Sequence, residues 1–265
     1  MPLVDIPALP AGALAVAAGV LARMLAVVAV GGMPVTVGAG PRVILAAALA
    51  VSVAAFPAAM AASPTRAFDG GSLAALIVIE AVVGASIGAA VAMVVSAAGW
   101  AGSMLGSVTG LNWADEFGGE GGGESAGLGR LAWWLGVAGF VAAGGHEAVV
   151  GGLVDSVRAI PVGAALADPR LWADRMMEAV TTMPAVALSI AVSLALPALV
   201  AVLVCHLAVA FCARTVAFDP GQGIVQAVAS LVVVAVIGMS ADSWIGGFGT
   251  LVQSPIEHCL RILHP

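Results

Sequence analysis

Few residues in this sequence have side chains that could do chemistry, and most of them lie within or beside long apolar stretches. The residues that could form a polar pathway through a membrane are Glu80, His146, Glu147 and Asp155. An ionisable side chain in a membrane segment is costly and usually has a function, such as conducting protons or ions. One hypothesis is therefore a stand-alone secondary transporter or channel that uses these residues.

The sequence contains no recognisable metal or catalytic site. His146 stands in the segment GGHE, but a zinc-protease helix needs a second histidine four residues on, where Val150 stands. Cys205 and Cys212 share one helix face without a second pair of metal ligands. Lysine is absent, which excludes P-loop and Schiff-base enzymes, and no catalytic serine or paired-aspartate motif stands out. We therefore expect no enzyme, no catalytic residue, no metal and no cofactor.

The composition is that of an integral membrane protein. Hydrophobic residues make up 62% of the 265 residues and charged residues only 9%, whereas soluble domains carry about 25% charged residues. The net charge of −6 also argues against a nucleic-acid partner, because nucleic acids bind basic surfaces. We expect the lipid membrane to be the main environment of the chain.

Six apolar blocks must position the candidate residues, and each is long enough to cross a hydrocarbon core of about 30 Å as a helix. They cover residues 11–30, 42–62, 73–98, 128–153, 184–213 and 224–248. The pattern predicts an all-α, polytopic membrane protein of about six hydrophobic helical segments, arranged as helical hairpins in a single membrane domain over 1–265. We expect 154–181 to be a polar connection and Pro197 to break the fifth block. The arginine distribution favours cytoplasmic termini.

Two series of glycines predict close helix packing. Glu80, Gly84 and Gly88 are four residues apart, and so are Gly102 and Gly106, which places each series near one helix face. Glu80 would either be buried in the resulting contact or lie near the lipid headgroups beside a generic packing groove. Both readings stay open. The full set of candidate packing and assembly residues is Glu80, Gly84, Gly88, Gly99, Gly102 and Gly106.

The stretch between the third and fourth blocks is rich in glycine and acidic residues. Gly118, Gly119 and 121–123 disfavour a helix, because each glycine costs about 1 kcal/mol there relative to alanine. Large apolar residues, among them Leu111 and Trp113, stand at the start of this stretch. Such a segment makes better sense facing a cavity or a partner protein than facing lipid. An ordinary solvated loop is the alternative.

An ordered series of short motifs resembles the FliR family of flagellar export-gate proteins and its injectisome counterpart SctT. The series runs from about 21 to 238: LARMLAVVAV with Arg23, GPRVILAAALA with Arg42, the Glu80-to-Gly88 series, Ala98-Gly99, Gly145-His146, LVDSVRAIPVG (153–163), and LALPALVAVLVCHLAVAFCAR ending at Arg214. Trp100 and the turn VAFDPGQ depart from the family pattern, as a divergent member would.

The resemblance implies a subunit of a protein export gate in the bacterial inner membrane. Its partners would be FliP-like and FliQ-like gate subunits and an FlhB-like switch protein, and unfolded export substrates would pass through the channel. The system could be flagellar or an injectisome. The loop 110–127 would be the pore plug, with Leu111, Asn112, Trp113 and Phe117 as plug residues. The polar positions that match the family are Arg23, Arg42, His146 and Arg214.

Overall fold

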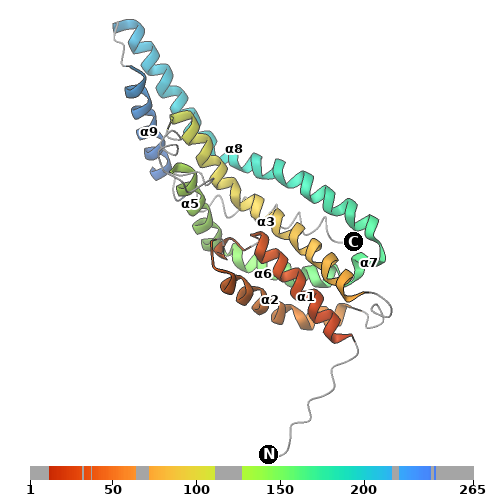
Figure 1. Cartoon of the computed structure of the whole chain (residues 1–265). Coiled ribbons are helices and arrows are strands. Elements are labelled where there is room, and N and C mark those ends of the chain that lie inside the picture. Colours follow the sequence, from red (N-terminus) through yellow and green to blue (C-terminus); the bar gives the residue numbers. More distant parts are fainter. Residues whose placement is uncertain are drawn as a thin grey trace, which may run out of the picture. The chain divides into compact units, whose positions relative to one another are not determined.

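Every element in the described part of the chain is helical (Figure 1). The computed structural model describes residues 12–31, 33–36, 38–63, 72–110, 127–216, 221–239 and 242. The elements are α1 (Ala13–Val30), the 3-10 helix η1 (Pro34–Thr36), α2 (Pro41–Ala62), α3 (Leu73–Thr109), α5 (Leu128–Ala142), α6 (Gly145–Ala159), α7 (Ala164–Ala167), α8 (Pro169–Val216) and α9 (Gly221–Met239). The predicted all-α fold is confirmed.

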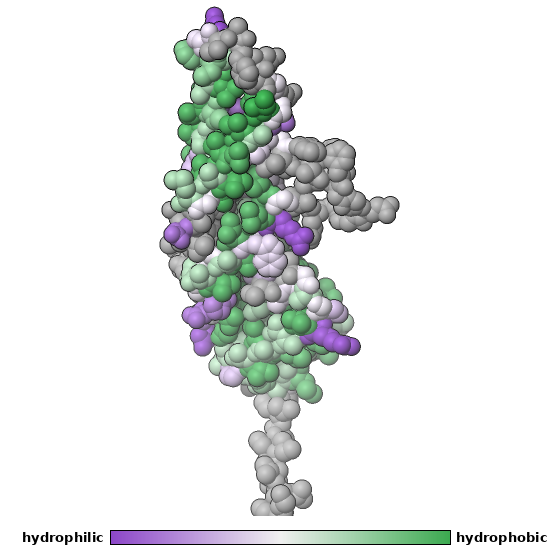
Figure 2. All heavy atoms as spheres, turned by 90° about the vertical axis from the view of Figure 1, so that its left-hand side faces the viewer, coloured by the Kyte–Doolittle hydropathy of each residue, from purple (hydrophilic) through white to green (hydrophobic). Residues whose placement is uncertain are grey.

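Described helices lie in all six apolar blocks. The predicted fourth block is not one helix but two, α5 and α6, bent by 68° at the break between them, and the end of the sixth block lies outside the described residues. Among the described residues, α1, α2, α3 and α8 are each long and apolar enough to cross a membrane. The α5–α6 pair makes a fifth candidate span if its break is counted as part of one crossing, and α9 is a shorter apolar helix. Figure 2 shows that hydrophobic residues cover most of the coloured face. The chain therefore has the architecture of a polytopic membrane protein.

The largest difference from the sequence prediction is the start of α8. The helix begins at Pro169, not Pro184, and it continues through Pro184 and Pro197. Its first turns are amphipathic, because the residues buried there recur every three or four positions: Trp172, Met176, Ala179 and Met183. Charged residues on the opposite face made this segment resemble a polar connection. Both internal prolines are exposed.

The chain divides into two compact units. The first contains residues 1–92, 147–182 and 256–265, and the second contains 93–146 and 183–255. Helices α3, α6 and α8 thus contribute to both units, whereas α1, α2 and α7 belong to the first and α5 and α9 to the second.

In the first unit, α1 and α3 approach each other closely enough for their backbones to touch. A Cβ added at Gly84 would overlap the backbone oxygen of Arg23, and one added at Gly88 would lie 2.7 Å from the backbone oxygen of Val27. Real side chains do not tolerate such contacts, so only glycine permits this separation of the two helices. Gly19 on α1 is similarly crowded by Val162.

In the second unit, α3 packs against α5 in the same manner. A Cβ at Gly102 would lie 2.5 Å from both the Cβ of Ala132 and the backbone oxygen of Leu128. Gly99 makes ordinary contacts with Trp133 at 3.5 Å, and Gly106 is buried. Small residues therefore set the helix spacing within each unit.

We predict that Gly84→Ala destabilises the protein by about 1–3 kcal/mol, because the new methyl group forces α1 away from α3. Gly151→Ala on α6 is the matched control, since a Cβ there meets nothing within 4 Å. The control should be neutral, or stabilising by up to about 1 kcal/mol through helix propensity. Thermal unfolding of the purified protein measures both effects. Equal unfolding temperatures for the two variants would refute the close contact.

Candidate functional site

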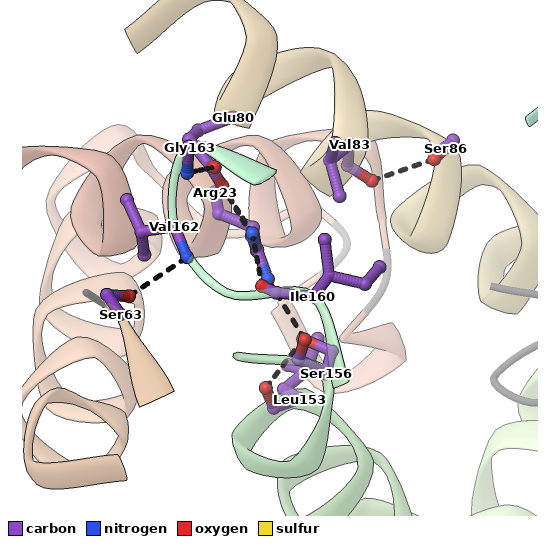
Figure 3. A network of polar contacts seen from close by, with 10 residues as sticks. All are labelled: Arg23, Ser63, Glu80, Val83, Ser86, Leu153, Ser156, Ile160, Val162 and Gly163. Carbon is purple, nitrogen blue, oxygen red and sulfur yellow. Dashed lines mark hydrogen bonds and ion pairs between the residues drawn. The ribbon is translucent and has the colours of Figure 1, made fainter. Parts of the chain in front are cut away.

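Arg23 is a fully buried arginine in the middle of an apolar helix. Its Nε donates to the Glu80 Oε2 at 2.7 Å, its Nη1 to the backbone oxygen of Ser156 at 3.1 Å, and its Nη2 to the backbone oxygen of Ile160 at 3.0 Å (Figure 3). An unpaired arginine at the bilayer centre costs about 2.5–3.5 kcal/mol on insertion scales. All three guanidinium nitrogens instead have partners within the first unit.

Glu80 on α3 is also fully buried, and both of its carboxylate oxygens accept hydrogen bonds. One oxygen forms the ion pair with Arg23, and the other accepts from the backbone N–H of Gly163 at 2.9 Å. A buried carboxylate is tolerated only when it is paired and hydrogen-bonded in this way. Glu80 therefore lies in the contact between α1 and α3, the first of the two readings that the sequence left open.

The turn after α6 is fixed by side chains from three other helical segments. The backbone N–H of Val162 donates to the Ser63 Oγ at the end of α2, at 3.1 Å, while the next N–H, from Gly163, donates to Glu80 (Figure 3). Arg23 places its positive charge against the carbonyl groups at the end of α6, where the helix dipole favours a cation. Gly163 has a φ of +87°, which suits glycine at the start of α7.

These contacts form one connected set, which we call the Arg23 cluster: Arg23, Ser63, Glu80, Ser156, Ile160, Val162 and Gly163. All of its members belong to the first compact unit. Its charged groups are both fully buried and their polar atoms are occupied by one another and by backbone groups. The cluster is therefore built to hold four helices and a turn together, and it offers no free group to a substrate.

The other residues predicted from family resemblance lie on the surface of the structure. Arg42 is exposed in the first turn of α2, His146 at the start of α6, and Arg214 in the last turn of α8. Asp155, a candidate for the polar pathway, forms an exposed ion pair with Arg158 at 2.8 Å. No group of three potential metal ligands occurs within the described ranges.

The predicted plug residues lie outside the described residues, and so do the acids of the same loop: Leu111, Asn112, Trp113, Phe117, Asp115, Glu116, Glu120 and Glu124. A glycine stands at each described end of the loop. Gly110 follows α3 with a φ of +72°, and Gly127 precedes α5 with a φ of +74°.

Sequence reasoning selected Arg23 and Glu80 separately but missed their contact and missed Ser63. One signal was available. Arg23 is the only charged residue in α1, and Glu80 is the only one in α3. Pairing two such charges of opposite sign lowers the free-energy cost of burying each of them in an apolar helix, so a contact between them is expected.

We predict that Arg23→Ala and Glu80→Ala each destabilise the protein by about 3–5 kcal/mol, because each leaves an uncompensated buried charge. Arg158→Ala is the matched control; its ion pair is exposed and should contribute only about 0–1 kcal/mol. Glu80→Gln should cost an intermediate amount of stability, since an amide oxygen can still accept from the backbone N–H of Gly163. Unfolding midpoints of the four variants test this. If Arg23→Ala lowers the stability no more than Arg158→Ala does, the buried ion pair between Arg23 and Glu80 is contradicted.

A family model described as bacterial export proteins, family 1, matches residues 14–254, from the first helix to beyond α9. No curated protein matches the chain. The family match covers most of the sequence and includes every residue of the Arg23 cluster. The chain therefore belongs to bacterial export proteins family 1, the FliR/SctT family, and is a multi-pass, non-enzymatic export-gate subunit of the inner membrane.

Proposed function

We propose that this chain forms the export channel together with FliP-like and FliQ-like subunits, that it contacts an FlhB-like switch protein, and that unfolded substrates pass through the assembled gate. The chain acts in this assembly as a single membrane domain over 1–265. Family membership supports a role in an export-apparatus complex, and the surface of the helices supports extensive contacts with other subunits.

The observation that carries the proposal is the exposed apolar surface of α2 and α8. In their most apolar windows only 28% of α2 and 33% of α8 is buried within the chain. Large hydrophobic residues are exposed along α8: Leu188, Val192, Leu196, Val200, Leu203, Val204, Leu207 and Phe211. Many alanines lie between them. Small residues let another helix approach closely, so these faces suit subunit contacts better than lipid alone.

The transporter alternative has less support. It requires Glu80 and Asp155 to serve a common polar pathway. Instead, Glu80 is buried with both oxygens occupied, and Asp155 is paired with Arg158 on the surface. A carboxylate that is already paired and shielded is poorly placed to exchange protons or bind an ion.

We also propose that the loop 110–127 plugs the closed channel. In lipid, a glycine-rich segment would leave backbone N–H and C=O groups without partners at a prohibitive cost. A protein-lined pore removes this difficulty, because the apolar root formed by Leu111, Trp113 and Phe117 can fill the lumen. The glycines that follow permit the loop to move aside. Asn112 lies within the same root.

The first test is co-purification. When this chain is expressed with FliP-like and FliQ-like partners, we expect a large hetero-oligomer and a marked gain in yield and thermal stability over the chain alone. Co-expression with an unrelated multi-pass protein is the control for general effects on insertion. A chain that stays monodisperse and folded by itself, with no gain from these partners, would contradict the proposal.

The second test is deletion of 112–125. If the loop is a plug, the complex still assembles but leaks ions and small solutes, which conductance recordings or the sensitivity of cells to small molecules can detect. Neutralising Asp115, Glu116, Glu120 and Glu124 is the control, and it should leave the seal nearly unchanged because the apolar root fills the pore. An intact permeability barrier in an assembled deletion variant would show that the loop is only a linker.

A further inference from the structure

A groove opens on the first unit between α1 and α2, which pack along each other. It has a volume of about 280 Å³ and an almost wholly apolar lining. The residues that line it are Ala17, Val20 and Leu21 from α1, and Leu49, Ser52, Val53 and Phe56 from α2. The hydroxyl group of Ser52 donates to the backbone oxygen of Ala48 at 2.6 Å, within α2 itself. The groove therefore suits an apolar occupant.

Arg42 lies on the same face of α2 as the groove. It precedes Leu49, Val53 and Phe56 by seven, eleven and fourteen residues, and these spacings return close to the same side of a helix. Arg42 is exposed, and its guanidinium has no hydrogen bond or ion pair within the described ranges. A cation without a protein partner thus stands at one end of an apolar stripe that continues along the groove.

Both helices place the groove at the same depth from the end of the hairpin that carries Arg42. On α2, the exposed lining begins at Leu49 and ends at Phe56, about 10–21 Å beyond Arg42 at a rise of about 1.5 Å per residue. On α1, the lining residues lie about 14–20 Å before the helix end at Val30. One leaflet of a hydrocarbon core of about 30 Å is about 15 Å thick. An acyl chain whose headgroup lies at Arg42 therefore reaches the groove.

We propose that this α1–α2 groove binds an acyl chain of an anionic phospholipid whose phosphate group pairs with Arg42. A guanidinium can donate two parallel hydrogen bonds to a phosphate group, and basic residues at a membrane surface attract lipids of net negative charge. In the groove, the acyl chain packs against both helices at once, so it gains more dispersion contacts than a chain on an open helix face.

A different face of α2 is suited to contacts with other helices. Its exposed residues are small or compact, and they recur at helical spacing: Ala50, Ala54, Pro57 and Ala61. Small residues let another helix approach closely. The groove face instead combines a cation with the larger exposed side chains Leu49 and Val53. A lipid in the groove therefore leaves the small-residue face of α2 open to the subunit contacts proposed above.

The experiment counts the phospholipids that the purified full chain retains, with any subunits that co-purify with it, by native mass spectrometry. Detergent-washed protein is offered phosphatidylglycerol, which is anionic, or phosphatidylcholine, which is zwitterionic. Arg42→Gln removes the cation, and Val53→Trp fills the groove. The matched controls are Arg130→Gln on α5 and Val78→Trp on α3, because both residues are exposed and neither lines the groove.

We expect the unaltered chain to retain phosphatidylglycerol in preference to phosphatidylcholine. Arg42→Gln should weaken this retention about fivefold, the effect of one basic residue at a membrane surface. Val53→Trp should abolish it, while both controls keep the lipid. Should Val53→Trp fail to assemble, Leu49→Trp decides by the same criteria.

The proposal is overturned if the two lipids are retained equally, or if Arg42→Gln or the groove-filling variant leaves the retention of phosphatidylglycerol unchanged. A photocrosslinking side chain at position 53 gives an independent readout. It should attach to phospholipid; attachment only to a neighbouring subunit would assign the groove to a protein partner and overturn the proposal as well.

Discussion

The first unit of this protein depends on the buried ion pair between Arg23 and Glu80. Each charge alone is expensive in an apolar helix, and together they are tolerated only with nearly perfect hydrogen bonding. The remaining donors of Arg23 reach the carbonyl groups at the end of α6, and the second oxygen of Glu80 reaches the turn that follows. One pair of side chains therefore fixes α1, α3, α6 and the entry to α7.

The close approach of α1 and α3 makes this pairing possible. Gly84 and Gly88 bring the backbone of α1 against α3 about one and two turns beyond Glu80, so the carboxylate and the guanidinium lie close enough to pair. A unit secured from the inside in this way can leave much of its helical surface apolar and open. Such a surface suits a subunit of an export-apparatus complex.

Hydropathy alone predicts the all-α fold and the six apolar blocks, because membrane helices need long runs with few charges. The start of α8 was missed, since its buried residues recur every three or four positions among charged residues, and a hydropathy average hides that pattern. The contact between Arg23 and Glu80 joins positions 57 residues apart, and no local rule specifies such a pairing. The ends of the glycine-rich loop are described, but its interior is not.

A charge exchange tests most directly whether the Arg23 cluster depends on its full hydrogen bonding or on charge attraction alone. The double variant Arg23→Glu/Glu80→Arg keeps an ion pair between α1 and α3, but a carboxylate at position 23 cannot donate to the backbone oxygens of Ser156 and Ile160. The measurement is the amount of chain recovered in the export-gate complex on a native gel. Our account predicts that the exchange recovers no more complex than Arg23→Glu alone, whereas full recovery would contradict it.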